Sequence, residues 1–240
     1  DAASKRMVAT SIVSSTLLSK LAAAYEVRCD HTLTGFKWIA NRAIAFDASG
    51  GEFVMGYEEA LGYCVGSVVR DKDGISAAVI VADMVSAEKA KGRTLIDRLT
   101  DIAREHGLHV GHQHSRSFPG PGGAVAMAAI MDRLRKDPPT ALEGAKLESM
   151  VDIQNGSTRT FVKGAKAPDL GLPSSNVLAF YYDDGSRILA RPSGTEPKIK
   201  FYFEMVQKMR SNGLLSTAQR KAAPAMAKRV EAFVKSALSK

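Results

Sequence analysis

An octet near the C-terminal end of the chain, Arg-Pro-Ser-Gly-Thr-Glu-Pro-Lys, gathers side chains that could hold a phosphate group. Arg191 offers a planar, permanently charged fork that can bind two phosphate oxygens at once. Ser193 and Thr195 add hydroxyl donors, and Lys198 adds a point charge. Gly194 lets backbone N–H groups converge on an anion without a Cβ in the way. These residue types together predict an anion site.

The surroundings of this octet separate it from two other readings. Its residue order does not match the GxxxxGK[ST] pattern of a Walker loop, and strands are expected on both sides of it, with no helix following. An ordinary tight turn would also explain the glycine and the prolines. The clustered arginine and hydroxyls favour the anion site over that plain turn.

Two adjacent carboxylates stand in a glycine-flanked stretch upstream, Gly-Tyr-Glu-Glu-Ala-Leu-Gly-Tyr. Glu58 and Glu59 could each accept hydrogen bonds from neighbouring hydroxyl groups, which suits a polyol. The alternative, a solvated helix start, is the commoner reading of such a pair from periodicity alone. Ala60 follows them and brings no hydroxyl.

Other charged residues could also face a ligand or have ordinary structural roles. Lys37 could face a ligand or be a surface lysine at a helix start. Asp71 and Asp73 could suggest a metal loop, but Lys72 separates them, so a helix start at Asp73 is favoured. Arg70 precedes them and is a weaker candidate for binding. The four histidines between residues 106 and 114 have no cysteine or carboxylate cluster beside them, which favours a solvated hinge over a metal site.

The pattern of elements predicts two kinds of domain. In the first half, strand and helix alternate, which argues for a mixed or parallel sheet flanked by helices. In the second half, a run of strands with an Asp-Asp-Gly turn indicates an antiparallel sheet with helices packed on it. The Gly-, Pro- and Ser-rich stretch 110–123 is expected to be the hinge. The expected strands are 7–13, 27–33, 51–55, 146–153, 176–182, 186–190 and 199–206, and the expected helices include 36–43, 75–89, 94–106, 124–136 and a basic C-terminal one.

Bulk properties exclude several classes of protein. The 240 residues are 45% hydrophobic and carry a formal net charge of +8. No apolar run approaches the ~18 residues of a membrane helix, and the two cysteines form no disulfide framework. The basic excess favours acidic partners, although much of it, such as Lys228 and Arg229, is expected on a solvated face of the last helix, where Pro224 is tolerable only near the start. No motif supports nucleic-acid or membrane binding, and the cytoplasm is the simplest location.

The octet, with the Ile-Lys-Phe-Tyr-Phe-Glu that follows it, resembles the C-terminal phosphate-binding loop of the α-D-phosphohexomutases, the phosphoglucomutase and phosphomannomutase family. The preceding stretch 172–190 is similar to that family's last domain. On this resemblance Arg191, Ser193, Gly194 and Thr195 match residues that hold the phosphate of the bound sugar. The stretch around Glu58 resembles the loop that reads the sugar hydroxyls, although the family commonly has serine where Ala60 stands.

The resemblance extends over essentially the whole chain. It implies that residues 1–112 are the third, α/β/α sugar-binding domain and that 113–240 are the fourth, α+β phosphate-binding domain. Lys37 matches a lysine that faces the cleft in the family, and the Arg-Asp-Lys-Asp-Gly stretch from Arg70 matches a segment that shapes it. The strand-first start of the chain fits a cut between the second and third domains.

Two parts of the family's machinery do not occur in the chain. No serine is followed by His-Asn-Pro, and no DGDxDR-type loop exists, so no catalytic residue and no metal ligand is assigned here. The resemblance implies Mg²⁺ for the full-length enzyme, hexose phosphates and hexose 1,6-bisphosphate as ligands, and the enzyme's own domains 1 and 2 as partners. The alternatives are a stand-alone, non-catalytic phosphosugar-binding module and, least supported, a basic nucleic-acid-binding protein.

Overall fold

The computed structural model describes residues 5–238. By their internal contacts they divide into two compact units. The first comprises the chain up to Gly107 together with Lys208–Leu215, and the second comprises Leu108–Gln207 and the residues from Ser216 onward. The predicted domain limits of 1–112 and 113–240 stay a prediction. Among the described residues no helix is long and apolar enough to cross a membrane.

The first unit is built on a four-stranded sheet with the order β2-β1-β3-β4. Strand β1 pairs in parallel with both β2 and β3, while β4 is antiparallel to β3. β1 lies in the middle of the parallel part, and five of its six residues are buried. The alternation of strand and helix predicted for this half is therefore confirmed. The strands are β1 (Arg6–Ser11), β2 (Arg28–Thr32), β3 (Glu52–Glu58) and β4 (Gly62–Val65).

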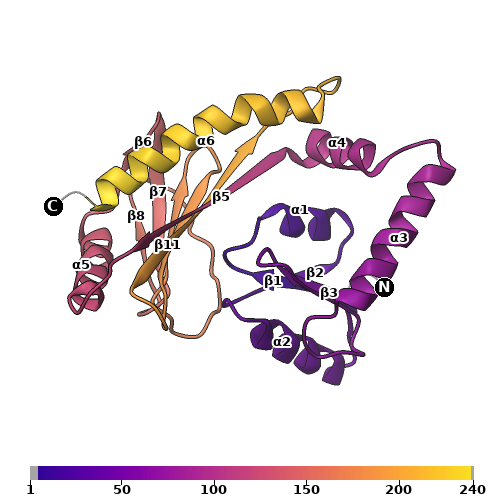
Figure 1. Ribbon diagram of the computed structural model, residues 1–240, viewed down its shortest axis with the longest axis horizontal. Coiled ribbons are helices and arrows are strands. Elements are labelled where there is room, and N and C mark those ends of the chain that lie inside the picture. The colour runs from indigo at the N-terminus through magenta and orange to yellow at the C-terminus, as the bar shows by residue number, and fades with distance from the viewer. Residues whose placement is uncertain (1–4, 239–240) are drawn as a thin grey trace. The chain divides into compact units, whose positions relative to one another are not determined.

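Helices α1 (Leu17–Ala24) and α2 (Phe36–Ala48) lie on opposite faces of this sheet (Figure 1). The connection from β1 through α1 to β2 and the connection from β2 through α2 to β3 run in opposite directions across the sheet. Because both are right-handed, they place their helices on opposite faces. Helix α2 buries Phe36 and Ile39 in a core that includes Phe53 of β3. The sheet and α2 thus fix the loops that follow the strands.

The next two helices begin at capping residues that their sequence predicts. Asp73 accepts hydrogen bonds from two backbone N–H groups at the start of α3 (Gly74–Ala90). Thr94 and Asp97 form a reciprocal capping box at the start of α4 (Leu95–His106). The expectation that a helix starts at Asp73 is confirmed.

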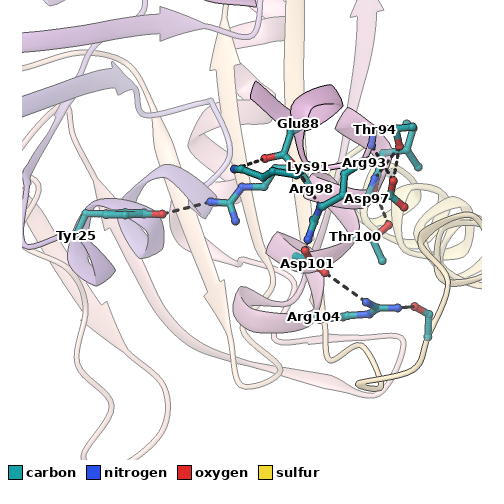
Figure 2. Close-up of polar contacts among 12 residues, drawn as sticks. Tyr25, Glu88, Lys91, Arg93, Thr94, Asp97, Arg98, Thr100, Asp101 and Arg104 are labelled. Carbon is teal, nitrogen blue, oxygen red and sulfur yellow. Dashed lines mark hydrogen bonds and ion pairs between the residues drawn. The ribbon is translucent and has the colours of Figure 1, made fainter. Parts of the chain in front are cut away.

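Ion pairs join the end of α3 to α4, and a hydrogen bond joins α4 to the segment Lys208–Leu215 of the first unit (Figure 2). The nearly buried Glu88 pairs with Arg93 at 3.0 Å, and Arg93 also bonds Asp101. This hydrogen bond from Arg93 holds the pKa of the Asp101 carboxyl below its usual range. Arg104 pairs with Asp101 at 3.3 Å and donates to the backbone carbonyl of Gly213 at 3.1 Å. The hydrogen bond from Arg104 thus ties the segment around Gly213 to the first unit.

The second unit holds a seven-stranded sheet in the order β5-β11-β10-β9-β7-β6, with β8 paired to β7. All of the strand pairings in the described part of this unit are antiparallel, as the sequence predicts. The strands are β5 (Leu108–Ser117), β6 (Ala141–Leu142), β7 (Ala145–Asp152), β8 (Ser157–Thr160), β9 (Leu178–Tyr182), β10 (Arg187–Pro192) and β11 (Lys198–Gln207).

The expected hinge at 110–123 is wrong over most of its length, because β5 occupies it. β5 pairs with β11 from Leu108 to Ser117. Nor do the histidines form a solvated hinge. The side chain of His109 is buried, with Nδ1 2.9 Å from the Glu204 carboxylate, and His114 lies opposite Phe201 in the ladder. Except for Gly111, the glycines and prolines that suggested a hinge come only after the strand has ended.

Helices α5 (Gly123–Lys136) and α6 (Leu215–Leu238) pack against this sheet and share one core with it (Figure 1). Phe233 of α6 is fully buried. Its ring makes edge contacts with Phe180 and Phe201, each 5.6 Å away between ring centroids. The aromatic cluster joins α6 to β9 and to β11, the strand that follows the 191–198 octet.

Two expectations for the last helix are wrong. Pro224 lies well inside α6 and not near its start, although a proline there removes one helical hydrogen bond at a cost of roughly 3 kcal/mol. Burial of Met226 in the core helps offset that cost. Arg229 is buried, in place of the expected solvated position, and pairs with Asp184 at 2.7 Å. Burial raises the pKa of Asp184, but hydrogen bonds from Ser186 and Arg229 leave it below its usual range.

Replacing the central aromatic ring tests this core. We expect Phe233→Ala to lower the free energy of unfolding of the second unit by about 3–5 kcal/mol, because the lost ring leaves a cavity among other aromatic rings. Urea unfolding followed by circular dichroism measures the change. Leu214→Ala, at an exposed position, is the control. A loss below about 1 kcal/mol for Phe233→Ala would contradict the packing described here.

Candidate functional site

The octet 191–198 forms the connection between β10 and β11. The strands stay paired up to Pro192 and Ile199, and the Ser193 N–H donates to the Lys198 carbonyl at 2.8 Å. The loop is therefore a closed turn at the end of a regular hairpin. Arg191 lies in the last ladder positions of β10, opposite Lys200, where the sheet limits its backbone freedom.

The loop is also held from its other side, by the start of α5. The Phe118 N–H donates to the Pro197 carbonyl at 2.7 Å. A Cβ on Gly123, the first residue of α5, would collide with the Phe118 carbonyl and lie 2.8 Å from the Pro197 Cβ. Glycine at this position therefore lets the loop and the helix approach each other closely.

A cavity of about 440 Å³ opens between the loop and α5. Met127 and Met131 of the helix border it with apolar surface, and Arg191, Ser193 and Gly194 border it from the loop. Arg191 is half-buried, and its guanidinium makes no hydrogen bond or ion pair with another residue in the described part of the chain. A partly desolvated cation without a carboxylate partner is well placed to take an anion.

The other polar residues of the octet have partners within the loop. The Ser193 and Thr195 hydroxyl oxygens lie 3.4 Å apart, so the structure brings the two predicted donors together. The Lys198 ammonium pairs with Glu196 at 2.8 Å, and this hydrogen bond holds the pKa of the Glu196 carboxyl below its usual range. Phosphate binding by the five octet residues stays a prediction: Arg191, Ser193, Gly194, Thr195 and Lys198.

A second group of candidate residues lies in the first unit, where the parallel strands end. In such sheets, ligands bind in the crevice outside the carboxyl ends of the strands. Glu58 closes β3, so the alternative of a helix start is wrong. Its carboxylate is nearly buried and accepts a hydrogen bond of 2.6 Å from the N–H of Gly35, which follows β2.

Glu59 ties a third loop to this edge of the sheet. It accepts a hydrogen bond of 2.5 Å from the N–H of Ser15, in the loop after β1. The loops after all three parallel strands therefore meet at the two glutamates. Ala60 is exposed in the turn that follows. Glu58 and Glu59, which were predicted to bind a polyol, therefore each use a carboxylate oxygen to hold the loops together.

The remaining candidates in this unit are less well placed. Lys37 is exposed near the start of α2, with its ammonium 5.6 Å from the centre of the Trp38 ring. Arg70 is exposed between β4 and α3 and has no partner among residues 5–238. The structure does not show a contact that brings either one to Glu58.

Sequence reasoning missed Lys72, which the structure does bring to these loops. Its ammonium lies 5.1 Å from the centre of the Phe36 ring, and a Cβ on Gly62 would be 3.2 Å from its aliphatic carbons. In the sequence, the aspartates on either side of Lys72 drew attention to a metal loop. Within residues 5–238, no group of three or more His, Cys, Asp and Glu side chains could hold a metal ion.

Two family models match the chain. "Phosphoglucomutase/phosphomannomutase, alpha/beta/alpha domain III" matches residues 1–105, and "Phosphoglucomutase/phosphomannomutase, C-terminal domain" matches residues 129–214. The chain belongs to the phosphoglucomutase/phosphomannomutase family. The predicted resemblance and the predicted fold class, an α/β domain followed by an α+β domain, are thereby confirmed.

Curated members of the phosphoglucomutase/phosphomannomutase family share about a third of their aligned residues with the chain. A probable phosphomannomutase of Haemophilus influenzae is 37% identical over 198 residues, which is 82% of this chain and 36% of the relative. A phosphoglucomutase of Staphylococcus epidermidis is 36% identical over 200 residues, or 83% of this chain and 36% of the relative. The chain thus spans little more than a third of the length of these relatives.

Solved structures of the family share the fold. The open form of the Paramecium exocytosis-sensitive phosphoprotein pp63/parafusin, a phosphoglucomutase, aligns with a TM-score of 0.59 and 23% identity, covering 91% of this chain and 36% of the other. A putative phosphomannomutase of Thermus thermophilus aligns with a TM-score of 0.51 and 17% identity, covering 90% of this chain and 36% of the other.

The glycine of the octet provides a test that separates binding from folding. Gly194 does not have a positive φ, and a Cβ added to it meets nothing within 4 Å. We therefore expect Gly194→Ala to leave the free energy of unfolding within about 0.5 kcal/mol of the original. The Gly194→Ala protein should bind inorganic phosphate at least about fivefold more weakly than the original chain, since a methyl group would obstruct an anion approaching the backbone N–H groups.

Titration of the two proteins with inorganic phosphate, followed by NMR chemical shifts, gives this comparison. Gly74→Ala is the matched control, because Gly74 also has open space at its Cβ and lies outside the octet. Equal phosphate affinity in Gly194→Ala and Gly74→Ala would show that no ligand approaches Gly194.

Proposed function

We propose that this chain is the substrate-binding half of a phosphoglucomutase or phosphomannomutase that works in the cytoplasm. The whole enzyme would interconvert hexose 1-phosphate and hexose 6-phosphate through a phosphoserine and a hexose 1,6-bisphosphate intermediate. Its family membership and its share of about 36% of its relatives' length support this proposal. The remainder of the enzyme, domains 1 and 2, would carry the phosphoserine.

Arg191 is the main support for this proposal, because it borders a cavity and has no partner among the described residues. Its guanidinium borders a cavity of about 440 Å³ together with Ser193 and Gly194, and no other described residue neutralises it. A phosphate monoester dianion supplies the charge and the paired oxygens that such a fork binds best. The hydroxyls of Ser193 and Thr195 would take further oxygens of the same phosphate.

In this account the chain binds and orients, and the phosphoryl transfer takes place on residues outside it. Arg191, Ser193 and Thr195 would hold whichever phosphate is not reacting. Glu58 and Glu59 would accept hydrogen bonds from ring hydroxyls that are common to both orientations of the sugar. Binding energy from these remote groups would position the reacting end and so lower the barrier to transfer.

Mg²⁺ would offset negative charge during phosphoryl transfer in the whole enzyme. The described residues of this chain do not offer a set of ligands for it. We therefore propose that the metal is held entirely by residues outside this chain.

The alternative is a stand-alone module that binds phosphosugars without catalysis. Both functions require the Arg191 site, so phosphate binding does not separate them. Turnover does: the protein with domains 1 and 2 should interconvert the two hexose phosphates, whereas this chain alone should bind them without converting them. Absence of turnover in the longer protein would favour the module.

Removing the arginine fork tests the proposed function. We expect Arg191→Ala to weaken binding of α-D-glucose 1-phosphate by about 10- to 100-fold, since a charge-assisted bidentate contact is typically worth ~1.5–3 kcal/mol. Arg191→Lys should recover only part of the loss, because it restores the charge without the fork. Isothermal titration calorimetry on the 240-residue chain measures the affinities.

Arg210→Ala is the matched control for the loss of one positive charge. Arg210 is an exposed arginine outside the cavity. Its replacement by alanine should leave the affinity for α-D-glucose 1-phosphate within about twofold of the original. If Arg191→Ala bound the sugar phosphate as well as Arg210→Ala does, the proposed function would lose its main support.

A further inference from the structure

Asn176 lies beside the phosphate cavity on a segment remote in sequence from the loop. It and Ser175 border the cavity together with Arg191, Ser193 and Gly194. The segment enters β9, which is hydrogen-bonded to β10, so the sheet brings the two borders together. Nothing in the proposed function above uses this asparagine.

Arg135 of α5 fixes the Asn176 side chain. Its Nε donates to Asp152 at 2.9 Å, and its Nη2 donates to Gln154 at 2.6 Å and to Oδ1 of Asn176 at 2.5 Å. Asp152 is only 3% exposed, so its charge needs the arginine. Because four side-chain acceptors, with Asp132 at 3.3 Å as the fourth, hold this one guanidinium, its position is well defined and it can in turn position Asn176.

These bonds determine which way the Asn176 amide faces. A guanidinium can only donate hydrogen bonds, so the atom of Asn176 that meets it must be the carbonyl oxygen. The NH₂ group therefore points away from Arg135. It makes no hydrogen bond with another residue in the part of the chain that the structure describes. The side chain thus offers two unused donors at the border of an anion cavity.

We infer that Asn176 is a further phosphate-binding residue of this cavity, with Arg135 as the residue that positions it. The inference rests on the proposed function, because it takes the ligand to be a phosphate monoester. Arg191 would bind the phosphate from the β10 side, and the Asn176 NH₂ would donate to it from the segment before β9. Met127 and Met131 border the same cavity with apolar surface, which suits the carbon skeleton of the ester.

Two substitutions at Asn176 test this role on the 240-residue chain, with inorganic phosphate as the probe and NMR chemical shifts as the readout. Asn176→Ala removes the donors, and we expect it to weaken phosphate binding about tenfold. Asn176→Asp keeps an acceptor for Arg135 but replaces the donors with negative charge. We expect it to weaken binding at least about 30-fold while the unfolding midpoint in urea stays unchanged or rises.

The controls are Asn155→Ala and Asn155→Asp. Asn155 is also an exposed turn asparagine whose Oδ1 accepts a hydrogen bond, here from the N–H of Ser157. These variants make the same chemical changes outside the cavity border and should bind phosphate within about twofold of the original chain.

The outcomes separate the inference from the proposed function. If the Asn176 variants bind phosphate like the Asn155 variants while Arg191→Ala does not bind it, the inference is wrong and the proposed function stands. If Asn176→Asp loses stability in proportion to its loss of binding, its role is structural and the inference is also wrong. If Arg191→Ala retains full phosphate affinity, the proposed function itself is wrong.

Discussion

Arg191 is half-buried at the border of the second unit's cavity, and no other described residue neutralises its positive charge. Elsewhere in this unit, buried arginines have carboxylate partners: Arg187 pairs with Glu204, and Arg229 pairs with Asp184. Leaving a partly desolvated cation unpaired has a free-energy cost. A ligand that brings two negative charges and paired oxygens would remove that cost, which is the physical basis of the phosphate assignment.

The rest of the second unit can be understood as support for that arginine. The β10–β11 hairpin fixes its backbone, the Phe118–Pro197 hydrogen bond fixes the far end of the loop, and the α5 glycine at position 123 allows their close approach. Behind the hairpin, the ring of Phe233 joins α6 to the strands. A rigid loop loses little entropy when it binds an anion, so this support contributes directly to affinity.

Features that depend on a few neighbouring residues could be predicted from the sequence. The loop residues around Arg191 contain their own donors, and Asp73 and Thr94 mark helix starts by local hydrogen bonds. The βαβ rhythm likewise predicted a mixed or parallel sheet for the first unit, which the structure has. In each case the determining interactions lie within one short segment or follow from simple periodicity.

Features that depend on distant partners could not be predicted in this way. Gly111 and the histidines of β5 looked like part of a hinge, because only pairing with β11 makes that segment a strand. Pro224 is accommodated within α6 by tertiary packing that its local propensity does not reveal. Asn176 has no signal of its own, since its role depends on Arg135, which is far from it in sequence. The position of Lys72 beside Phe36 likewise could not be predicted, because the neighbouring aspartates pointed to a metal loop or a helix start.

The most direct test of this account is a crystal structure of the chain with α-D-glucose 1-phosphate. The account predicts that the phosphate lies in the cavity with two of its oxygens within about 3 Å of the Arg191 guanidinium, and with another near Ser193. A sugar phosphate bound elsewhere, with the Arg191 guanidinium still without a partner, would contradict it.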